Sequence, residues 1–299
     1  MSAAQPMHNR VRASLAPYGL LLPFAVLFGL FTLYPLARSL VLAFQQTFGP
    51  EATRYVGLAN FAALLKDSLF WVAVRNTVLY TLGSVLIQLP LAMILALALQ
   101  SKGVRGKSFF RMLLFAPATV GVAYAAIMFG VMFEKQTGLI NQLLQSVTGR
   151  GLDFPWQQEH VLWMLILASL WMFTGFNMIF FSAALANVRE ELVEASTLDG
   201  ASAWQRFVHV IVPEIRPVAG FVVLMSVIGS LQLFELPYLI LNNSGGPDNR
   251  GLTIITYLYQ NGFENGDLGY ASAVGWMLAT VLILIAAAQR VIAARRSVA

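Results

Sequence analysis

Six long apolar stretches constrain this sequence more than any other feature. Each lacks Asp, Glu, Lys and Arg, and they cover residues 13–37, 76–101, 112–133, 161–187, 217–234 and 268–289. A helix needs roughly 20 apolar residues to cross the hydrocarbon core of a bilayer. The sequence therefore predicts an all-α membrane protein with six transmembrane helices. Because Pro90 and Pro117 fall inside two of the stretches, we expect those helices to be kinked.

Composition supports a membrane setting and excludes several other classes of protein. Of the 299 residues, 58% are hydrophobic and 11% are charged, whereas soluble domains carry about 25% charged residues. No cysteine is present, which excludes disulfides and thiolate metal sites. The three histidines lack the spacing of metal ligands, so we expect no metal and no cofactor. The net charge of +5 is scattered among short loops, which disfavours binding to nucleic acid.

The distribution of basic residues predicts the orientation in the membrane. One set of loops and termini contains 12 Lys and Arg residues, and the opposite set contains 5, or 7 with Arg38 and Arg75. Basic residues concentrate on the cytoplasmic side of membrane proteins. Both termini are therefore expected in the cytoplasm, with residues 1–16 as a tail and residues 17–296 as the six-helix domain.

The loop over residues 188–214 is unusually polar for a chain of this kind. Residues 190–195 are good helix formers, Asp199-Gly200 is a turn signal, and Ser202 can cap a following helix. That second helix carries an apolar stripe, and Pro213 and Pro217 are expected to end it. The stripe consists of Trp204, Phe207, Val208 and Ile211. The pattern alone leaves two interpretations open, a helix lying on the membrane surface or a docking site.

A family resemblance favours the docking site. The loop holds Glu191, Leu192, Glu194, Ala195, Asp199, Gly200, Ala201, Ser202, Trp204, Gln205, Phe207, Ile211, Val212, Pro213 and Pro217. This pattern resembles the EAA loop of carbohydrate-type permease subunits of bacterial binding-protein-dependent ABC importers. Gly245-Gly246-Pro247 before the last apolar stretch is similar to a motif of the same family. Ser196 and the Asn187-Val188 entry depart from the usual pattern without removing its Glu or Gly.

The resemblance implies a type I ABC importer permease fold and a set of partners. These are an ABC ATPase dimer, a second permease subunit, an extracytoplasmic solute-binding protein and a sugar or related polyol. The residues implied to couple the subunit to the ATPase are Glu194, Ala195, Asp199, Gly200, Ala201, Trp204 and Phe207. The chain itself lacks a phosphate-binding loop, because Ser101 stands where a Gly must precede Gly106-Lys107-Ser108. We therefore expect a transport subunit of the bacterial inner membrane and not an enzyme.

The resemblance also implies a substrate pathway between the fourth and fifth apolar stretches. The candidate residues are Ser169, Met172, Phe173, Phe176, Ser226, Ser230 and Glu235. Each of them is equally compatible with ordinary packing between helices. Glu235 is the one acidic residue within a membrane segment, where it lines the pathway, forms a structural pair or is partly neutralised near the outer interface. A secondary transporter or channel is the alternative function, but it leaves the polar loop at 188–214 unexplained.

Overall fold

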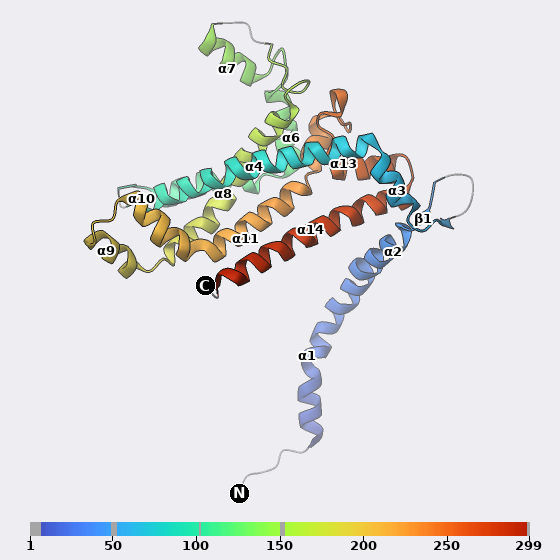
Figure 1. Cartoon of the computed structure of the whole chain (residues 1–299), viewed down its shortest axis with the longest axis horizontal. Coiled ribbons are helices and arrows are strands. Elements are labelled where there is room, and N and C mark those ends of the chain that lie inside the picture. Colours follow the sequence, from blue (N-terminus) through green and yellow to red (C-terminus); the bar gives the residue numbers. More distant parts are fainter. Residues whose placement is uncertain (1–6, 49–52, 102, 150–152, 298–299) are drawn as a thin grey trace. The chain divides into compact units, whose positions relative to one another are not determined.

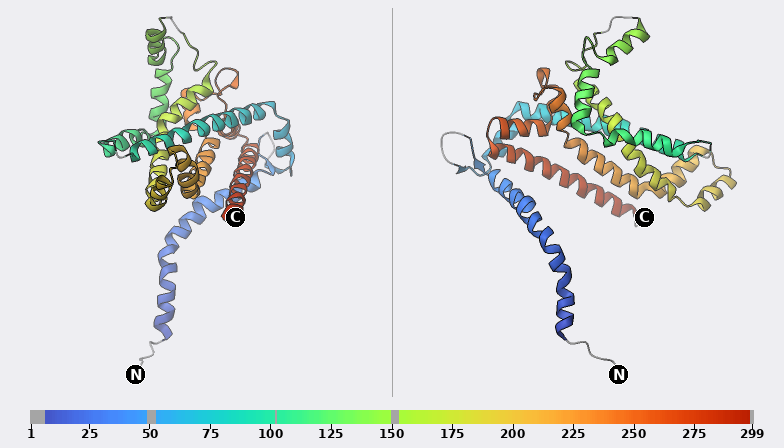
Figure 2. Two further views of the ribbon diagram at one scale, coloured as in Figure 1. Left: turned by 60° about the vertical axis from the view of Figure 1, so that its left-hand side comes forward. Right: turned by 180° about the vertical axis from the view of Figure 1, so that it is seen from behind.

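The computed structural model describes residues 7–48, 53–101, 103–149 and 153–297, which are almost entirely helical. The chain separates into two compact units. The first contains residues 1–64 and 261–276, and the second contains residues 65–260 and 277–299. Figures 1 and 2 show the ribbon from three directions. We describe each unit by itself.

In the first unit, α1 (Met7–Phe28), a π-helical turn (Gly29–Leu33) and α2 (Tyr34–Leu42) follow one another without a break. The helix begins at Met7, inside the segment expected to be a tail. Strands β1 (Gln45–Gln46) and β2 (Arg54–Tyr55) pair antiparallel, a hairpin that the sequence did not predict. Asn60 of α3 (Ala59–Lys66) donates hydrogen bonds to the carbonyls of Ala43 and Gln45, at 3.0 and 2.9 Å. That side chain fixes α3 against the hairpin.

The second unit is built around three helices that run side by side (Figures 1 and 2). These are α4 (Ser68–Gln100), α8 (Val161–Ala186) and α11 (Val212–Leu231). Alanines with no exposed surface lie on α4 and α8, among them Ala92, Ala96 and Ala168. Small side chains let membrane helices approach closely, which compensates for the absence of a hydrophobic driving force in lipid.

Gly175 marks the closest approach in this unit. A Cβ atom at this position would overlap the backbone carbonyl of Leu114 on α5 (Lys107–Phe115). A larger residue at position 175 would therefore push α5 away from α8. This contact therefore sets how closely α5 packs on α8.

The third apolar stretch is broken, and our prediction of one kinked helix was wrong. It forms α5, a 3-10 turn (Ala116–Thr119) and α6 (Val122–Met132), with a bend of 93° between the two parts. Pro117 lacks a backbone N–H, and Gly121 takes an extended conformation, so the helical hydrogen bonds cannot continue. In the described part of the chain, five helices are long and apolar enough to cross a membrane, or six if this bent pair counts as one span.

The helix after the polar loop continues where we predicted that it would end. α10 (Ala203–Arg206), a π-helical turn (Phe207–Ile211) and α11 form one uninterrupted helix. Pro213 closely follows the π-helical turn, and such a turn accommodates the backbone N–H that proline lacks within a continuous helix. The helix instead breaks after Leu231, and residues 232–234 lead into α12 (Glu235–Ile240). The fifth apolar stretch thus forms the second half of a longer helix.

The remaining elements include α7 (Leu139–Thr148), α9 (Glu190–Leu198), a 3-10 turn (Pro247–Asn249), α13 (Ile254–Tyr259) and α14 (Leu268–Ser297). The glycine-rich loop before α13 is tied to α4 by buried polar groups. Asn76 donates to the carbonyls of Asn249 and Leu252, at 2.8 and 3.1 Å. The Thr77 hydroxyl accepts from the Ile254 amide at 3.0 Å. Hydrogen bonds from Asn76 and Thr77 therefore hold the loop that follows Gly245-Gly246-Pro247 against α4.

Candidate functional site

The polar loop forms a helical hairpin made of α9 and α10, which we call the α9–α10 hairpin (residues 190–206). α9 ends at Leu198, and Gly200 follows with a φ of 77°. This left-handed conformation is accessible to Gly at little cost, which explains the turn predicted at Asp199-Gly200. Ser202 then caps α10, as predicted. Its hydroxyl accepts from the Gln205 amide while the Gln205 side chain accepts from the Ser202 amide.

The hairpin is held together and attached to α11 by side-chain contacts. The Arg206 guanidinium on α10 donates to the Thr197 hydroxyl on α9 at 2.8 Å. Arg189, the N-cap residue of α9, pairs with Glu214 in the first turn of α11 at 2.7 Å. The hydrogen bond and the negative charge of Glu214 raise the pKa of Arg189 above its usual value. The hairpin therefore has a defined shape and a defined attachment.

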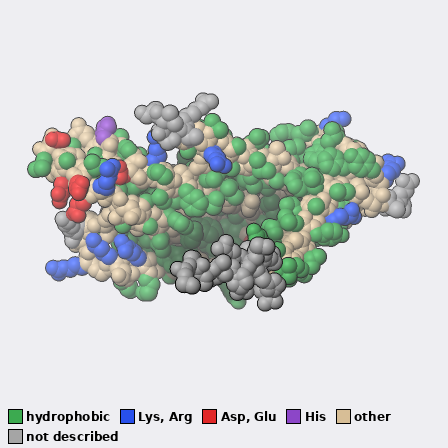
Figure 3. Space-filling model, turned by 90° about the horizontal axis from the view of Figure 1, so that it is seen from below, with side chains coloured by type: hydrophobic (Ala, Val, Ile, Leu, Met, Phe, Trp, Pro, Cys, Tyr) green, Lys and Arg blue, Asp and Glu red, His purple; other side chains and the backbone are tan. Residues whose placement is uncertain are grey.

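The outer face of the hairpin is both apolar and acidic. Leu198 is 89% exposed and Trp204 is 70% exposed. Glu190, Glu191 and Glu194 are exposed on α9, and Glu194 precedes Leu198 by one helical turn. Figure 3 shows acidic side chains gathered at the end where α9 lies. A large exposed aromatic residue beside an exposed leucine is a feature of interaction surfaces.

The predicted coupling residues divide into two groups. Five of them are exposed, namely Glu194, Ala195, Asp199, Gly200 and Trp204. Ala201 and Phe207 are half-buried, and the Phe207 ring lies 5.7 Å from the Trp204 ring. Trp204 can therefore contact a partner directly, whereas the half-buried Phe207 packs against the Trp204 ring. Their role in coupling stays a prediction.

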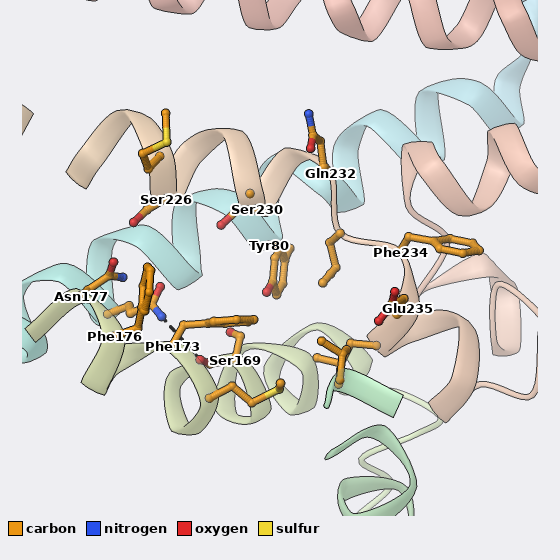
Figure 4. A pocket seen from close by; sticks show the side chains of 17 residues that line it. Tyr80, Ser169, Phe173, Phe176, Asn177, Ser226, Ser230, Gln232, Phe234 and Glu235 are labelled. Carbon is orange, nitrogen blue, oxygen red and sulfur yellow. Dashed lines mark hydrogen bonds between the residues drawn. The ribbon is translucent and has the colours of Figure 1, made fainter. Parts of the chain in front are cut away.

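A pocket of about 420 Å³ lies among the helices of the second unit. Its size falls within the range of small-molecule sites. Figure 4 shows side chains from α4, α8 and α11 around it. The polar lining residues are Tyr80, Gln88, Ser169, Asn177, Ser226, Ser230, Gln232 and Glu235. The remaining lining residues are Val122, Met172, Phe173, Phe176, Met225, Gly229, Leu233, Phe234 and Leu236.

All seven predicted pathway residues line this pocket. Ser169, Met172, Phe173 and Phe176 reach it from α8, Ser226 and Ser230 from α11, and Glu235 from the start of α12. Phe173 and Phe176 keep 38% and 44% of their surface exposed. The structure thus brings together residues separated by as many as 66 positions. Their contact with a transported molecule remains a prediction.

The sequence reasoning missed the contribution of α4. Tyr80 and Gln88 both line the pocket, and neither was a candidate. A signal existed, because Asn76, Tyr80, Ser84 and Gln88 recur every four residues within an apolar stretch. That spacing places polar groups on one face of a helix, and such a face in a membrane is directed toward a cavity or a partner helix.

Some polar groups of the pocket are already hydrogen-bonded, and others are not. The Ser230 hydroxyl lies 3.2 Å from that of Ser84, and the Ser169 hydroxyl donates to the Ile166 carbonyl at 2.8 Å. The side chains of Asn177, Gln232 and Glu235, which line the pocket, form no hydrogen bond among the described residues. These three groups are available to a ligand. No cluster of metal-ligating side chains occurs in the described ranges.

A lined pocket between apolar helices, together with an exposed hairpin outside them, is the arrangement expected of a membrane transport subunit. The chain belongs to the family of binding-protein-dependent transport system inner membrane components, whose model matches residues 88–298. This confirms the family that the polar loop indicated. A member of this family is a membrane component of an importer and not an enzyme.

Curated relatives cover most of the chain. An arabinooligosaccharide transport system permease protein, AraP of Halalkalibacterium halodurans, is 35% identical over 274 residues, which are 91% of this chain and 86% of that protein. A lactose transport system permease protein, LacF of Rhizobium radiobacter, is 33% identical over 267 residues, covering 88% of this chain and 89% of that protein.

Solved structures agree with the fold. The crystal structure of a bacterial ABC transporter that imports the acidic polysaccharide alginate matches with a TM-score of 0.84 at 22% identity, covering 97% of this chain and 99% of that one. A second alginate transporter structure, in complex with an alginate pentasaccharide-bound periplasmic protein, matches with a TM-score of 0.81 at 22% identity, covering 95% of this chain and 96% of that one. The likeness confirms the type I ABC importer permease fold expected from the sequence.

Proposed function

We propose that this chain is the permease subunit of an ATP-driven importer that carries a sugar or a related polyol across the bacterial inner membrane. In this proposal the chain crosses the membrane six times, with the bent α5–α6 pair as one passage, and both termini face the cytoplasm. A solute-binding protein delivers the cargo from outside. An ABC ATPase dimer drives import from the cytoplasmic side.

The chemistry of the pocket supports a carbohydrate cargo. Sugars bind by placing an apolar face on aromatic rings and their hydroxyl groups on polar side chains. Phe173 and Phe176 provide exposed ring surface, and Asn177 and Gln232 provide unpaired amide groups. The AraP and LacF relatives are named for arabinooligosaccharide and lactose transport, which supports the same class of cargo.

The surface of the α9–α10 hairpin supports docking of an ATPase. Leu198 and Trp204 expose apolar area that a partner could bury, and Glu194 adds a charge beside them. A hairpin with its internal hydrogen bonds already formed loses little conformational entropy when it binds. The chain has no phosphate-binding loop of its own, so the energy for transport has to come through such a contact.

The observation that supports the proposal most strongly is a long continuous helix between the hairpin and the pocket. A single uninterrupted helix extends from Ala203 through Leu231, with Trp204 exposed at one end and Ser230 in the pocket near the other. These two residues are 26 positions apart, or about 39 Å along a helix. A rigid element of this length can carry a displacement at the hairpin to the pocket. Coupling of this kind requires that ATP and cargo each favour one of two conformations.

Two further partners complete the proposal. A pathway across the membrane is expected to lie between this chain and a second permease subunit, as the family resemblance implies. The alginate transporter structure that includes a periplasmic protein supports delivery of cargo by a separate solute-binding protein.

Affinity purification from a native membrane tests the proposal. An ATPase should co-purify with the chain, and ATP hydrolysis in proteoliposomes should rise when a loaded binding protein is added. Replacing both Leu198 and Trp204 by Ala should abolish co-purification. Val147→Ala serves as the matched control, because Val147 is 84% exposed on α7, away from the hairpin. Retention of the ATPase by the double variant would contradict the proposed docking surface.

A further inference from the structure

The charge of the pocket indicates which kind of carbohydrate it takes. This inference rests on the proposed function. Eight polar side chains line the pocket, and seven of them are uncharged. The eighth is Glu235. No Lys, Arg or His occurs among the described lining residues. Every formal charge on the pocket wall is therefore negative.

Glu235 is not neutralised by a neighbouring residue. It follows the break after α11 and begins α12, and it lies at the end of the pocket beside Phe234 (Figure 4). The residue is exposed, and it forms no ion pair within the described ranges. Its carboxylate is therefore free to act on whatever enters the pocket.

The basic residues on the lining helices do not line the pocket. α6, α8 and α12 contain no Lys, Arg or His. On α4, Arg75 precedes Tyr80 by five positions, or about 7 Å along the helix axis, and its side chain is exposed. On α11, Arg216 precedes Met225 by nine positions, or about 13 Å, and is likewise exposed.

We propose that the pocket takes an uncharged saccharide and that Glu235 is a specificity-determining residue which excludes anionic sugars. A carboxylate accepts hydrogen bonds from sugar hydroxyl groups, so it favours a neutral cargo. The same carboxylate repels a uronate or a sugar phosphate, because both carry a negative charge. Phe173 and Phe176 contribute stacking surface that requires no charge on the sugar.

The comparison with the alginate importer makes this inference specific. That transporter imports an acidic polysaccharide and has the same fold. A shared fold does not determine the cargo, because the cargo is selected by the side chains of the site. An anionic cargo calls for cationic side chains such as Arg, which bind carboxylates in a forked geometry. This pocket presents a carboxylate instead.

Equilibrium binding to the complete transporter, purified with its partner subunits in nanodiscs, tests the inference. The binding protein is omitted, so that it cannot set the selectivity. Three radiolabelled probes of similar size are compared, namely arabinotriose, trigalacturonate and a trimer of glucosamine. Wild-type transporter should bind arabinotriose at least about tenfold more tightly than trigalacturonate, as expected for one uncompensated like charge.

Two variants assign the selectivity to Glu235. Glu235→Gln should reduce the preference for arabinotriose over trigalacturonate while changing arabinotriose binding little. Glu235→Arg should reverse the preference. Glu159→Gln is the matched control, because Glu159 is an exposed acid before α8 that does not line the pocket. Its selectivity should equal that of the wild type.

Each other result overturns the inference. Equal binding of trigalacturonate by the wild type would show that the partner subunit supplies a cation, and an unchanged preference in Glu235→Gln would show that another group sets the selectivity. Tighter binding of the glucosamine trimer would indicate a cationic cargo.

In all three cases an ATPase can still co-purify and a loaded binding protein can still stimulate ATP hydrolysis, so the proposed function would stand. Absence of binding by all three probes would refute the uncharged saccharide and the carbohydrate class together.

Discussion

The guanidinium of Arg189 pairs with the carboxylate of Glu214 at 2.7 Å, across 25 positions of the sequence. This contact ties the start of α9 to the first turn of α11. α11 carries Ser226 and Ser230 into the pocket, so the ion pair adds a second link between the α9–α10 hairpin and the pocket besides the continuous helix.

Loss of this ion pair should uncouple ATP hydrolysis from transport. Arg189→Ala should lower the number of cargo molecules imported per ATP hydrolysed, because the hairpin can then move without moving α11. Thermal stability should change little, since the Arg189 side chain is 65% exposed and ion pairs with an exposed partner are screened. The measurement is the ratio of uptake to ATP hydrolysis in proteoliposomes. Exchanging the two charges, as Arg189→Glu with Glu214→Arg, should restore the ratio, and a double variant as defective as the single one would count against the link.

Gly200 is expected to be the most sensitive position of the hairpin turn. Its φ of 77° is left-handed, and a residue with a Cβ is destabilised there by roughly 1–2 kcal/mol. Gly200→Ala should therefore weaken ATPase co-purification, whereas Gly200→Asn should retain more of it, because Asn tolerates this conformation better. A Cβ atom added at Gly200 would have no neighbour within 4 Å, so steric overlap cannot explain a difference between the Ala and Asn variants. Equal binding by the Ala variant and the wild type would argue against a rigid turn.

Gly175 should be required for the packing of α5 on α8. A Cβ there overlaps the Leu114 carbonyl, so Gly175→Ala should destabilise the second unit by about 1–3 kcal/mol, the usual cost of overpacking. The readout is the fraction of protein that remains monodisperse after heating in detergent. Gly130→Ala on α6 is the control, because nothing lies within 4 Å of Gly130. Similar heat resistance of the two variants would mean that α5 can shift freely.

The turn after α6 should respond to acid through Glu134. Its carboxylate accepts from the backbone and hydroxyl of Thr137 and from the Gln136 amide, at 2.5, 2.9 and 2.8 Å, and these hydrogen bonds lower the pKa of Glu134 below its usual 4.5. Since the folded pKa is depressed, the stabilisation is complete above pH 4.5 and is lost as the pH falls through the folded value. The protection of the two amides against hydrogen exchange, relative to an unstructured chain at the same pH, should fall over that range.

Glu134→Gln separates this effect from general acid unfolding. The Gln side chain cannot ionise, so the protection of the Gln136 and Thr137 amides against exchange should already be low at neutral pH. It should also change less with acid than the protection in the wild type. If both proteins show the same dependence on pH, the carboxylate does not hold the turn.

Much of this protein could be predicted from local sequence patterns. Five of the six apolar stretches coincide with a helix long and apolar enough to cross a membrane, because the length and apolarity of a span are local properties. Gly200 and Ser202 predicted the turn and the cap of the hairpin, since left-handed backbone and N-cap hydrogen bonds depend on residues within a few positions. The polar loop indicated the family, and the family indicated seven residues that prove to line one pocket.

Only the tertiary structure decided the rest. Whether Pro213 ends a helix depended on the π-helical turn before it, and the 93° bend of the third stretch depended on how Pro117 and Gly121 act together. Tyr80 and Gln88 entered the pocket because α4 packs between α8 and α11, a contact between segments far apart in the sequence. That no Lys, Arg or His of the described ranges lines the pocket with Glu235 is likewise a property of three-dimensional placement. Local patterns determine the helices, whereas the charge and shape of a cavity arise only when distant helices share its wall.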